Sequence, residues 1–205
     1  MNLSDVKFNC KFFRGAIPCK PNKQHDVQCA NCTYFEPWEK HILIIKLGAM
    51  GDVIRTTPLV VKYNKMFRNV RFTWLTDFPD VLPPSEIHDI WKPTAFNIEK
   101  LKNRKFDIAI NLDKEEEACI LLEQVNAAEK YGFIWENGHL AAATKAAEHK
   151  IITGLFDHIS KQNTKSYLEE IFEICHLTFD FEEYLLNYNK ALAKKWQEIF
   201  ESRAD

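Results

Sequence analysis

The chain has 205 residues, of which 46% are hydrophobic and 27% charged, and its formal net charge is −2. This length and composition predict one soluble globular domain with a small appendage. The net charge argues neither for nor against an anionic partner, and we expect no nucleic-acid partner. No run reaches the ~18 apolar residues of a membrane span, and the N-terminus lacks an apolar signal-peptide segment. We therefore expect a cytoplasmic protein with reduced thiols.

Residues 1–40 stand apart because they hold four of the six cysteines and show no sustained helical or strand period. Cys10, Cys19, Cys29 and Cys32 have the spacing C-x8-C-x9-C-x2-C, and four thiolates suit tetrahedral zinc. So short a segment has too little core to fold unaided, and a metal would supply that energy. We predict a Cys-rich module with structural zinc. The alternatives are an iron–sulfur cluster, unligated or redox-active thiols, or His25 replacing one cysteine.

Basic residues also gather in this segment, namely Lys7, Lys11, Arg14, Lys20 and Lys23. They form either a solvated face or a patch that meets phosphate or anionic lipid. The second reading predicts peripheral contact with the cytoplasmic face of the inner membrane.

From residue 41 onward, apolar runs alternate with amphipathic stretches. We expect strands at residues 42–47, 70–75, 87–91, 106–112 and 130–135. We expect helices after residue 52, with a kink at Pro58, and at residues 115–125 and 190–200. Asn137-Gly138 predicts a turn, and the chain beyond it reads as mostly helical, with a capping box at Ser166-x-x-Glu169. Residues 41–205 therefore form an α/β domain: a Rossmann-like parallel sheet flanked by helices.

The first strand leads into the loop Gly48-Ala-Met-Gly51, which opens a helix carrying Asp52. Open parallel sheets bind ligands at the carboxyl ends of their strands, and glycines let the backbone approach a ligand closely. Lys46, Arg55, Thr56 and Thr57 lie on or near this loop. Neither a GxGxxG nor a P-loop pattern is present. From spacing alone, Asp52 reads as a helix N-terminal acid stabilised by the helix dipole.

The consecutive pattern Lys46-Leu-Gly-x-x-Gly-Asp-Val-x-x-Thr-x-Pro58 closely resembles the N-terminal signature of glycosyltransferase family 9, the ADP-heptose:lipopolysaccharide heptosyltransferases. The resemblance implies an inverting transferase of the two-domain GT-B architecture that needs no metal for catalysis. It also implies that Asp52 is the general base, taking the proton of an acceptor hydroxyl as that hydroxyl attacks the donor sugar. Lys46, Gly48, Gly51, Arg55, Thr56 and Thr57 would then contact substrate.

A second site candidate follows the fourth strand. Asn111-Leu-Asp113-Lys114 should face the same crevice, and it resembles a Leu-Asp-Lys segment of family members with a similar Cys-rich start. It is either a strand-end turn with a local salt bridge or an acceptor-binding segment. In the second reading Lys114 meets a phosphate or carboxylate of the acceptor. The segment 163–167 also resembles a family segment, although helix capping already explains Ser166.

The resemblance extends over roughly residues 5–175 and corresponds to the acceptor-binding half of a GT-B enzyme. We find no second glycine-rich strand–loop–helix for a nucleotide-sugar, so we expect the donor-binding domain to be absent and the isolated half to be inactive. The expected partners are a phosphorylated saccharide or lipopolysaccharide-core acceptor, and a nucleotide-sugar held by the missing domain. The alternatives are a non-catalytic binding or adaptor module with a structural metal site, or a sensor of phosphate ligands.

Overall fold

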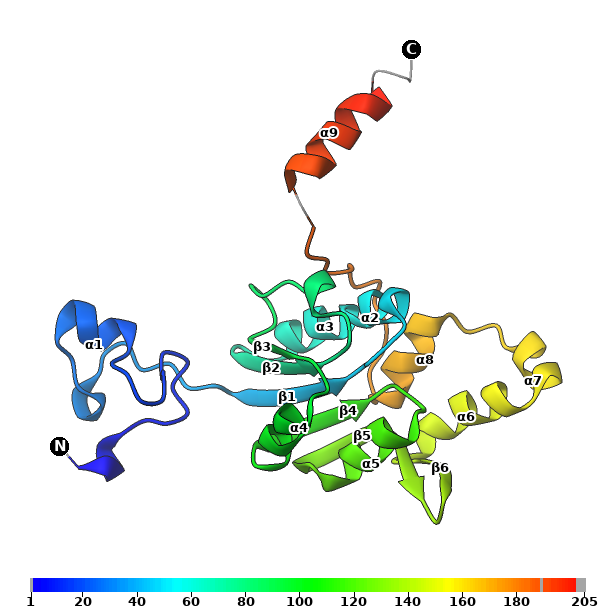
Figure 1. The fold of residues 1–205 in the computed structure, drawn as a ribbon, viewed down its shortest axis with the longest axis horizontal. Helices are drawn as coiled ribbons and strands as arrows, with labels where there is room; N and C mark the ends of the chain where they lie inside the picture. The colour runs from blue at the N-terminus through cyan, green and yellow to red at the C-terminus, as the bar shows by residue number, and fades with distance from the viewer. Residues whose placement is uncertain (1, 189, 202–205) are drawn as a thin grey trace.

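The computed structural model describes residues 2–188 and 190–201 and shows an α/β fold (Figure 1). In this part of the chain one six-stranded sheet has the order β3-β2-β1-β4-β5-β6. Strands β1 to β5 pair in parallel, and β6 is antiparallel to β5. The strands are β1 Lys40–Ile45, β2 Val70–Leu75, β3 Asp89–Trp91, β4 Lys105–Asn111, β5 Asn126–Glu136 and β6 His139–Ala142. The predicted α/β class with a Rossmann-like sheet is confirmed.

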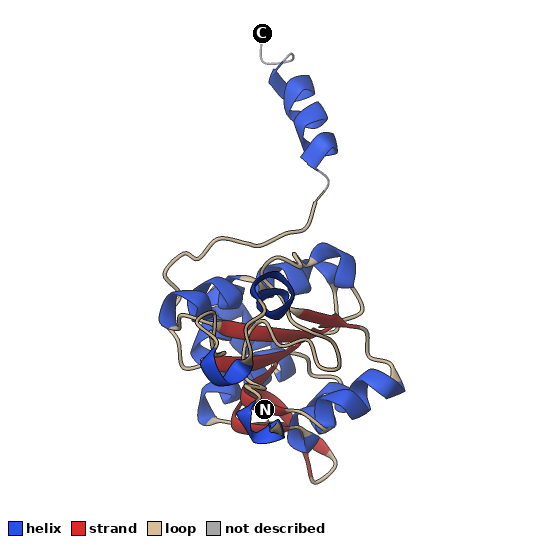
Figure 2. Ribbon diagram, turned by 90° about the vertical axis from the view of Figure 1, so that its left-hand side faces the viewer, coloured by secondary structure: helices blue, strands red, loops and turns tan. Residues whose placement is uncertain are grey.

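Helices cover both faces of the sheet (Figures 1 and 2). The α-helices are α1 Lys20–His25, α2 Met50–Thr56, α3 Pro58–Met66, α4 Ala95–Lys102, α5 Glu116–Gln124, α6 Glu148–Leu155, α7 Asp157–Gln162, α8 Tyr167–Ile174 and α9 Lys190–Glu201. Short 3-10 turns occur at Leu3–Asp5, Cys29–Asn31, Pro79–Val81 and Lys145–Ala147.

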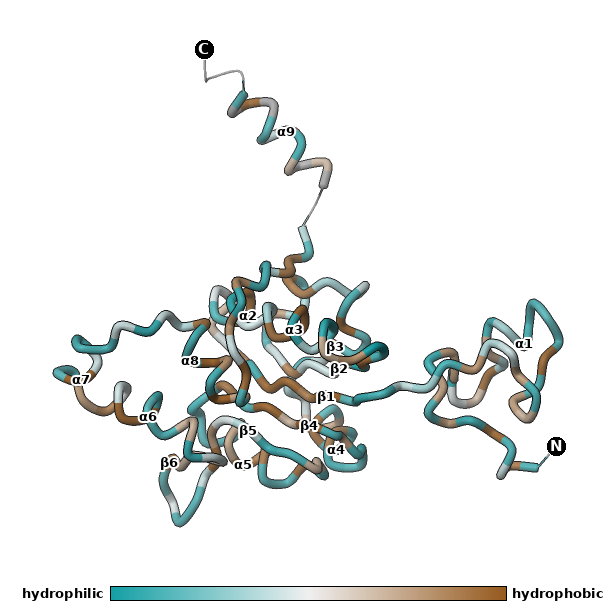
Figure 3. The backbone as a smooth tube through the Cα atoms, turned by 180° about the vertical axis from the view of Figure 1, so that it is seen from behind, coloured by the Kyte–Doolittle hydropathy of each residue, from teal (hydrophilic) through white to brown (hydrophobic). Residues whose placement is uncertain are grey.

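Strand β1 lies in the middle of the core, and its side chains alternate between the two faces. Ile42 and Ile44 pack with α2, α3 and α8, whereas Leu43 and Ile45 pack with α4 and α5. All four of these side chains are fully buried. Figure 3 shows the resulting hydrophobic band along the strands. A sheet covered on both faces explains why this strand reads as a continuous apolar run.

Most predicted elements are confirmed within a few residues, and the differences are local. The helix after Asp52 is two helices, because Pro58 cannot donate to the helical ladder and begins α3. Helix α4 was not predicted, although Thr94 caps it by accepting the N–H of Asn97 at 3.3 Å. The glycine loop is also shorter than predicted, since α2 already begins at Met50.

The Asn137-Gly138 turn is confirmed, but a strand rather than a helix follows it. Asn137 and Gly138 have φ values of 50° and 82°, the left-handed pair that a two-residue hairpin requires. The hairpin joins β5 to β6. Strand propensity is weak here because His139-Leu-Ala-Ala contains no β-branched residue.

Two segments extend from the sheet domain in Figure 1. Residues 2–37 form a small irregular body joined to β1, and α9 lies apart from the sheet. An isolated bridge pairs Cys10 with Pro37, and the Trp38 ring packs edge-on against His88 at 4.6 Å. No helix in residues 2–188 and 190–201 combines the length and the apolar character needed to cross a bilayer.

An ion-pair cluster ties β3 to its neighbours and should make stability pH-dependent. Asp89 accepts hydrogen bonds from Arg71 at 2.9 Å and from Arg104 at 2.8 Å. Burial alone would raise the pKa of Asp89, but the two guanidinium groups hold that pKa below its ordinary value. A carboxylate with a lowered folded-state pKa stabilises the fold above its unfolded pKa, and this contribution is lost as the pH falls through the folded value.

We therefore expect Asp89→Asn to destabilise the protein by about 1 kcal/mol at pH 7 and by less at pH 3, as measured by urea unfolding. The exposed Asp80, replaced in the same way, serves as the control and should show no such pH-dependent difference. An Asp89→Asn penalty of equal size at both pH values would contradict the lowered pKa.

Candidate functional site

A cavity of about 280 Å³ opens at the carboxyl ends of β1 and β4. It is lined by the loops after β1 and β4, the first turn of α2, strand β5, and helices α6 and α8. The lining residues are Lys46, Gly48, Ala49, Asp52, Leu112, Asp113, Lys114, Glu115, Phe133, Lys150, Tyr167, Ile171 and Ile174. In an open parallel sheet this edge is where ligands bind. The topology therefore brings the two segments singled out from the sequence to one place.

A buried ion pair joins the two strand-end loops. The Lys46 ammonium donates to Asp113 Oδ1, and the Leu47 backbone N–H donates to Asp113 Oδ2. Lys46 and Asp113 are only 5% and 3% exposed. Burial raises the pKa of Asp113, and the contacts with Lys46 and Leu47 oppose that rise. Asp113 therefore fixes the start of the Asp52 loop, which fits the strand-end salt-bridge reading of this segment.

The Asn111 amide shapes the turn that carries Asp113. Its Nδ2 donates to the carbonyl oxygens of Asp113 at 2.9 Å and Phe133 at 2.8 Å, and its Oδ1 accepts the Asp113 N–H at 3.0 Å. Gly132 permits this close packing of β5, because a Cβ at its φ of +100° would lie 1.7 Å from the Asn111 carbonyl oxygen. The loop after β4 is thus fixed both by Asn111 and by the neighbouring strand β5.

The Asp52 carboxylate lies in the first turn of α2 and lines the cavity, with a third of its side chain exposed. One oxygen accepts a hydrogen bond from Arg55, and the other lies 4.0 Å from the Lys46 ammonium. The hydrogen bond to Asp52 raises the pKa of Arg55. Asp52 is therefore a solvent-reachable carboxylate between two cations, one buried and one half-exposed.

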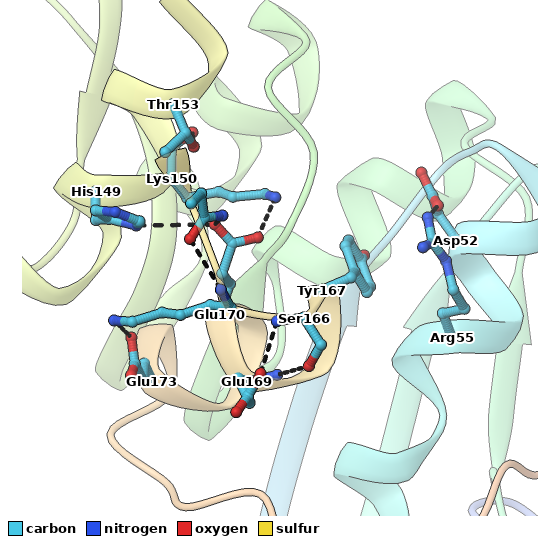
Figure 4. Close-up of polar contacts among 12 residues, drawn as sticks. Asp52, Arg55, His149, Lys150, Thr153, Ser166, Tyr167, Glu169, Glu170 and Glu173 are labelled. Atoms are coloured by element: carbon cyan, nitrogen blue, oxygen red, sulfur yellow. Dashed lines mark hydrogen bonds and ion pairs between the residues drawn. The ribbon is translucent and has the colours of Figure 1, made fainter. Parts of the chain in front are cut away.

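Tyr167 forms one wall of the cavity, between the Asp52–Arg55 pair and the Lys150–Glu170 pair (Figure 4). The Arg55 guanidinium lies 4.3 Å from the centre of the Tyr167 ring, and the Lys150 ammonium lies 5.6 Å from it. The phenol oxygen is 3.3 Å from Thr56 Oγ1. Burial raises the pKa of Tyr167 to about 12, so the phenol stays neutral near pH 7.

Two further ammonium groups adjoin the same wall. Lys114 Nζ donates to the backbone oxygen of Lys150 at 2.7 Å, while the Lys150 ammonium pairs with the buried Glu170 (Figure 4). Glu170 also accepts Asn163 Nδ2 at 3.0 Å. Burial lowers the pKa of Lys114, and the nearby charge of Lys150 lowers it further. Among the described residues, no carboxylate lies within ion-pair distance of Lys114. Its charge is therefore available to an anion.

The structure separates the predicted site residues into two groups. Lys46, Gly48, Asp52, Asp113 and Lys114 line the cavity, whereas Gly51, Arg55, Thr56 and Thr57 do not. Both threonines are fully buried and serve the helices. Thr56 Oγ1 donates to the Asp52 carbonyl oxygen at 2.8 Å, and Thr57 Oγ1 donates to that of Ile54 at 2.7 Å.

Sequence reasoning missed Lys150 and gave Tyr167 little weight. Lys150 comes from α6, far along the chain from either strand-end loop, and no motif marks it. Tyr167 follows the capping residue Ser166, whose predicted capping box is confirmed. The resemblance of the segment 163–167 to a family segment was the available signal.

Fold and site together define a Rossmann-like α/β protein with a carboxylate and several ammonium groups at the ligand-binding edge of its sheet. No family model matches the chain. Over 104 residues it is 28% identical to the lipopolysaccharide core heptosyltransferase OpsX of Haemophilus influenzae, a match that covers 46% of this chain and 30% of that protein. The chain thus spans about a third of the length of this curated relative. The resemblance to heptosyltransferases is confirmed for this part of the sequence.

Solved structures also resemble part of the chain. One is the crystal structure of the glycosyl transferase family 9 from Veillonella parvula. It is 22% identical to this chain with a TM-score of 0.38, and the match covers 45% of this chain and 31% of that one. Another is the E. coli heptosyltransferase WaaC with ADP-2-deoxy-2-fluoro heptose. It is 16% identical to this chain with a TM-score of 0.42, and the match covers 70% of this chain and 50% of that one.

Proposed function

We propose that this chain is the acceptor-binding part of a glycosyltransferase of the heptosyltransferase type, with Asp52 as the general base. The observation that carries the proposal is the Asp52 carboxylate in the lining of a cavity that Lys46, Lys114 and Lys150 also line. The similarity to OpsX, a lipopolysaccharide core heptosyltransferase, supports the reaction class.

The proposed reaction needs one proton acceptor next to a bound hydroxyl. The acceptor oxygen attacks the anomeric carbon of a nucleotide-sugar, the bond from that carbon to the diphosphate breaks, and the configuration inverts. The hydroxyl proton passes to Asp52 as the new bond forms. The nucleoside diphosphate leaves with the electron pair, and a donor-binding domain outside this chain would hold it.

The ammonium groups indicate an acceptor that carries a phosphate or a carboxylate. Lys114 and Lys150 line the cavity from separate elements, and the Lys46 ammonium lies 4.0 Å from the Asp52 carboxylate. Because these lysines line the same cavity as Asp52, one bound molecule could place an anionic group at the lysines and a hydroxyl at Asp52. Charge-assisted hydrogen bonds of this kind also orient a saccharide, which supports catalysis by positioning.

Replacing either lysine should weaken anion binding by this chain. We expect Lys114→Gln and Lys150→Gln each to raise the Kd for glucose 6-phosphate about tenfold, the effect of losing one charge-assisted hydrogen bond of about 1.4 kcal/mol. Titration calorimetry or NMR shift titration at low salt measures this Kd. Inorganic phosphate as a second probe separates recognition of phosphate from recognition of sugar.

Lys105→Gln is the matched control, because Lys105 is an exposed lysine at the amino end of β4, on the opposite edge of the sheet. It should leave the Kd unchanged. Equal weakening by all three variants would reduce the effect to net charge and overturn the assigned subsite. ADP-sugar should not bind the chain by itself.

A second function is favoured by one contact. The Asp52 carboxylate already accepts a hydrogen bond from Arg55, as a structural helix N-terminal acid would. On that reading the chain is a non-catalytic binding or adaptor module that uses the same cavity. Anion binding is common to both functions, whereas the requirement for an ionisable Asp52 belongs to the transferase alone.

A further inference from the structure

The N-terminal module has almost no core of its own. Within residues 2–40, Pro21 is the one residue that the structure buries. Large apolar side chains lie outside, with Leu3 75%, Phe8 57% and Ile17 52% exposed. Its regular structure amounts to the six-residue helix α1 and short 3-10 turns. Burial of apolar surface therefore contributes little to holding this module together.

The interior of the module is a cavity of about 230 Å³ that all four module cysteines line. Cys10 precedes the sharp turn closed by the hydrogen bond from Phe13 N to Cys10 O, and Cys19 caps α1. Cys29 and Cys32 border a 3-10 turn. Each of the four is a free, half-buried thiol. Sites separated by up to 22 positions in the sequence thus face one space.

The other lining residues are mostly apolar or aromatic, among them Phe12, Phe13, Ile17 and Tyr34. The polar lining side chains other than the cysteines include the amides Asn22 and Gln28 and the cations Lys7 and Arg14, but no carboxylate. The four thiols are therefore the soft donors that zinc prefers in this cavity. His25 does not line it, since the His25 ring stacks on Tyr34 at 4.7 Å. The structure therefore favours the four cysteines over a set in which His25 replaces one.

The thiols surround the cavity without converging on one point. In the part of the chain that the structure describes, no three His, Cys, Asp or Glu side chains are close enough together to hold an ion. Binding thus requires the cysteine-bearing loops to move inward and close the cavity. Little packing opposes that movement, because Pro21 alone is buried there.

We infer that the four cysteines of this module bind one zinc ion, and that zinc closes the cavity and supplies the folding energy that the missing core does not. Each thiol that becomes a ligand releases its proton to solvent, so the ion is held by thiolates. Cys10 also pairs with Pro37 next to β1, so zinc would fix the module against the start of the sheet. The inference is independent of the proposed transferase function.

The test is the zinc content of the full chain, purified under reducing conditions and repleted with zinc. We expect about one zinc per chain, and a loss of most of it in Cys29→Ser and in Cys32→Ser. Cys119→Ala is the control, because Cys119 is buried on helix α5, outside the module. It should retain the zinc.

Limited trypsin digestion of the wild-type chain gives a second readout that needs no variant to fold. Arg14 and Lys23 are exposed and neither precedes a proline, and a chelator should speed cleavage there about tenfold or more while thermal unfolding of the sheet domain stays unchanged. Absence of zinc after repletion, or unchanged cleavage, would overturn the inference. Iron in the purified chain, together with visible absorbance, would overturn the zinc inference and indicate an iron–sulfur cluster on the same thiols.

Discussion

Replacing Asp52 by asparagine should lower glycosyl transfer by about a thousandfold when the chain acts together with a donor-binding domain. The substitution keeps the size of the side chain and removes its ability to accept the proton of the acceptor hydroxyl. Asp52 lines the cavity and is a third exposed, so a bound hydroxyl can reach it. The rate is best measured with saturating acceptor, so that weakened binding does not contribute.

The fold should survive this change. The Asp52–Arg55 pair is partly exposed, with side-chain exposures of 32% and 49%, and such pairs contribute about 1 kcal/mol or less. Asp157→Asn is the matched control, since Asp157 is an exposed aspartate on α7, away from the cavity. Full transfer by Asp52→Asn would exclude the base and leave the binding-module function. Equal losses in both variants would point to a general effect of charge.

Removing Asp113 should cost far more stability than removing Asp52. Asp113→Ala leaves the Lys46 ammonium buried without its carboxylate, and breaking a buried ion pair from one side costs about 3–5 kcal/mol. The Leu47 N–H would lose its acceptor as well. Urea unfolding measures the loss, and the Asp52 loop should become more mobile because its start is no longer fixed to β4.

A paired replacement tests the cause. In Lys46→Met with Asp113→Leu both charges are absent, so most of the lost stability should return.

The ionised pair is not strongly favourable in itself, because burial raises the pKa of Asp113. A raised folded-state pKa means that this group's contribution falls as the pH rises from 3.8 through the folded value. A double variant no more stable than Asp113→Ala would show that shape, rather than an unpaired charge, caused the loss.

Sequence reasoning predicted where the Asp52 and Asp113 segments lie, but not the contact between Lys46 and Asp113. Strand–loop–helix order placed Asp52 and Asp113 at one edge, because parallel strands end together at the same side of a sheet. It did not show that Lys46 would pair with Asp113 rather than stay available to a ligand. That contact joins positions 67 residues apart, and only the register of β1 against β4 sets it.

Local periodicity and backbone chemistry were enough to predict the α/β class, the Pro58 break, the Asn137-Gly138 turn and the Ser166 cap. Tertiary packing, by contrast, brings Lys150 and Tyr167 to Asp52 around one cavity and buries Thr56 and Thr57 in structural roles. Helices α6 and α8 reach that cavity by packing over the sheet, through contacts between residues far apart in the chain. Local sequence patterns do not predict such contacts.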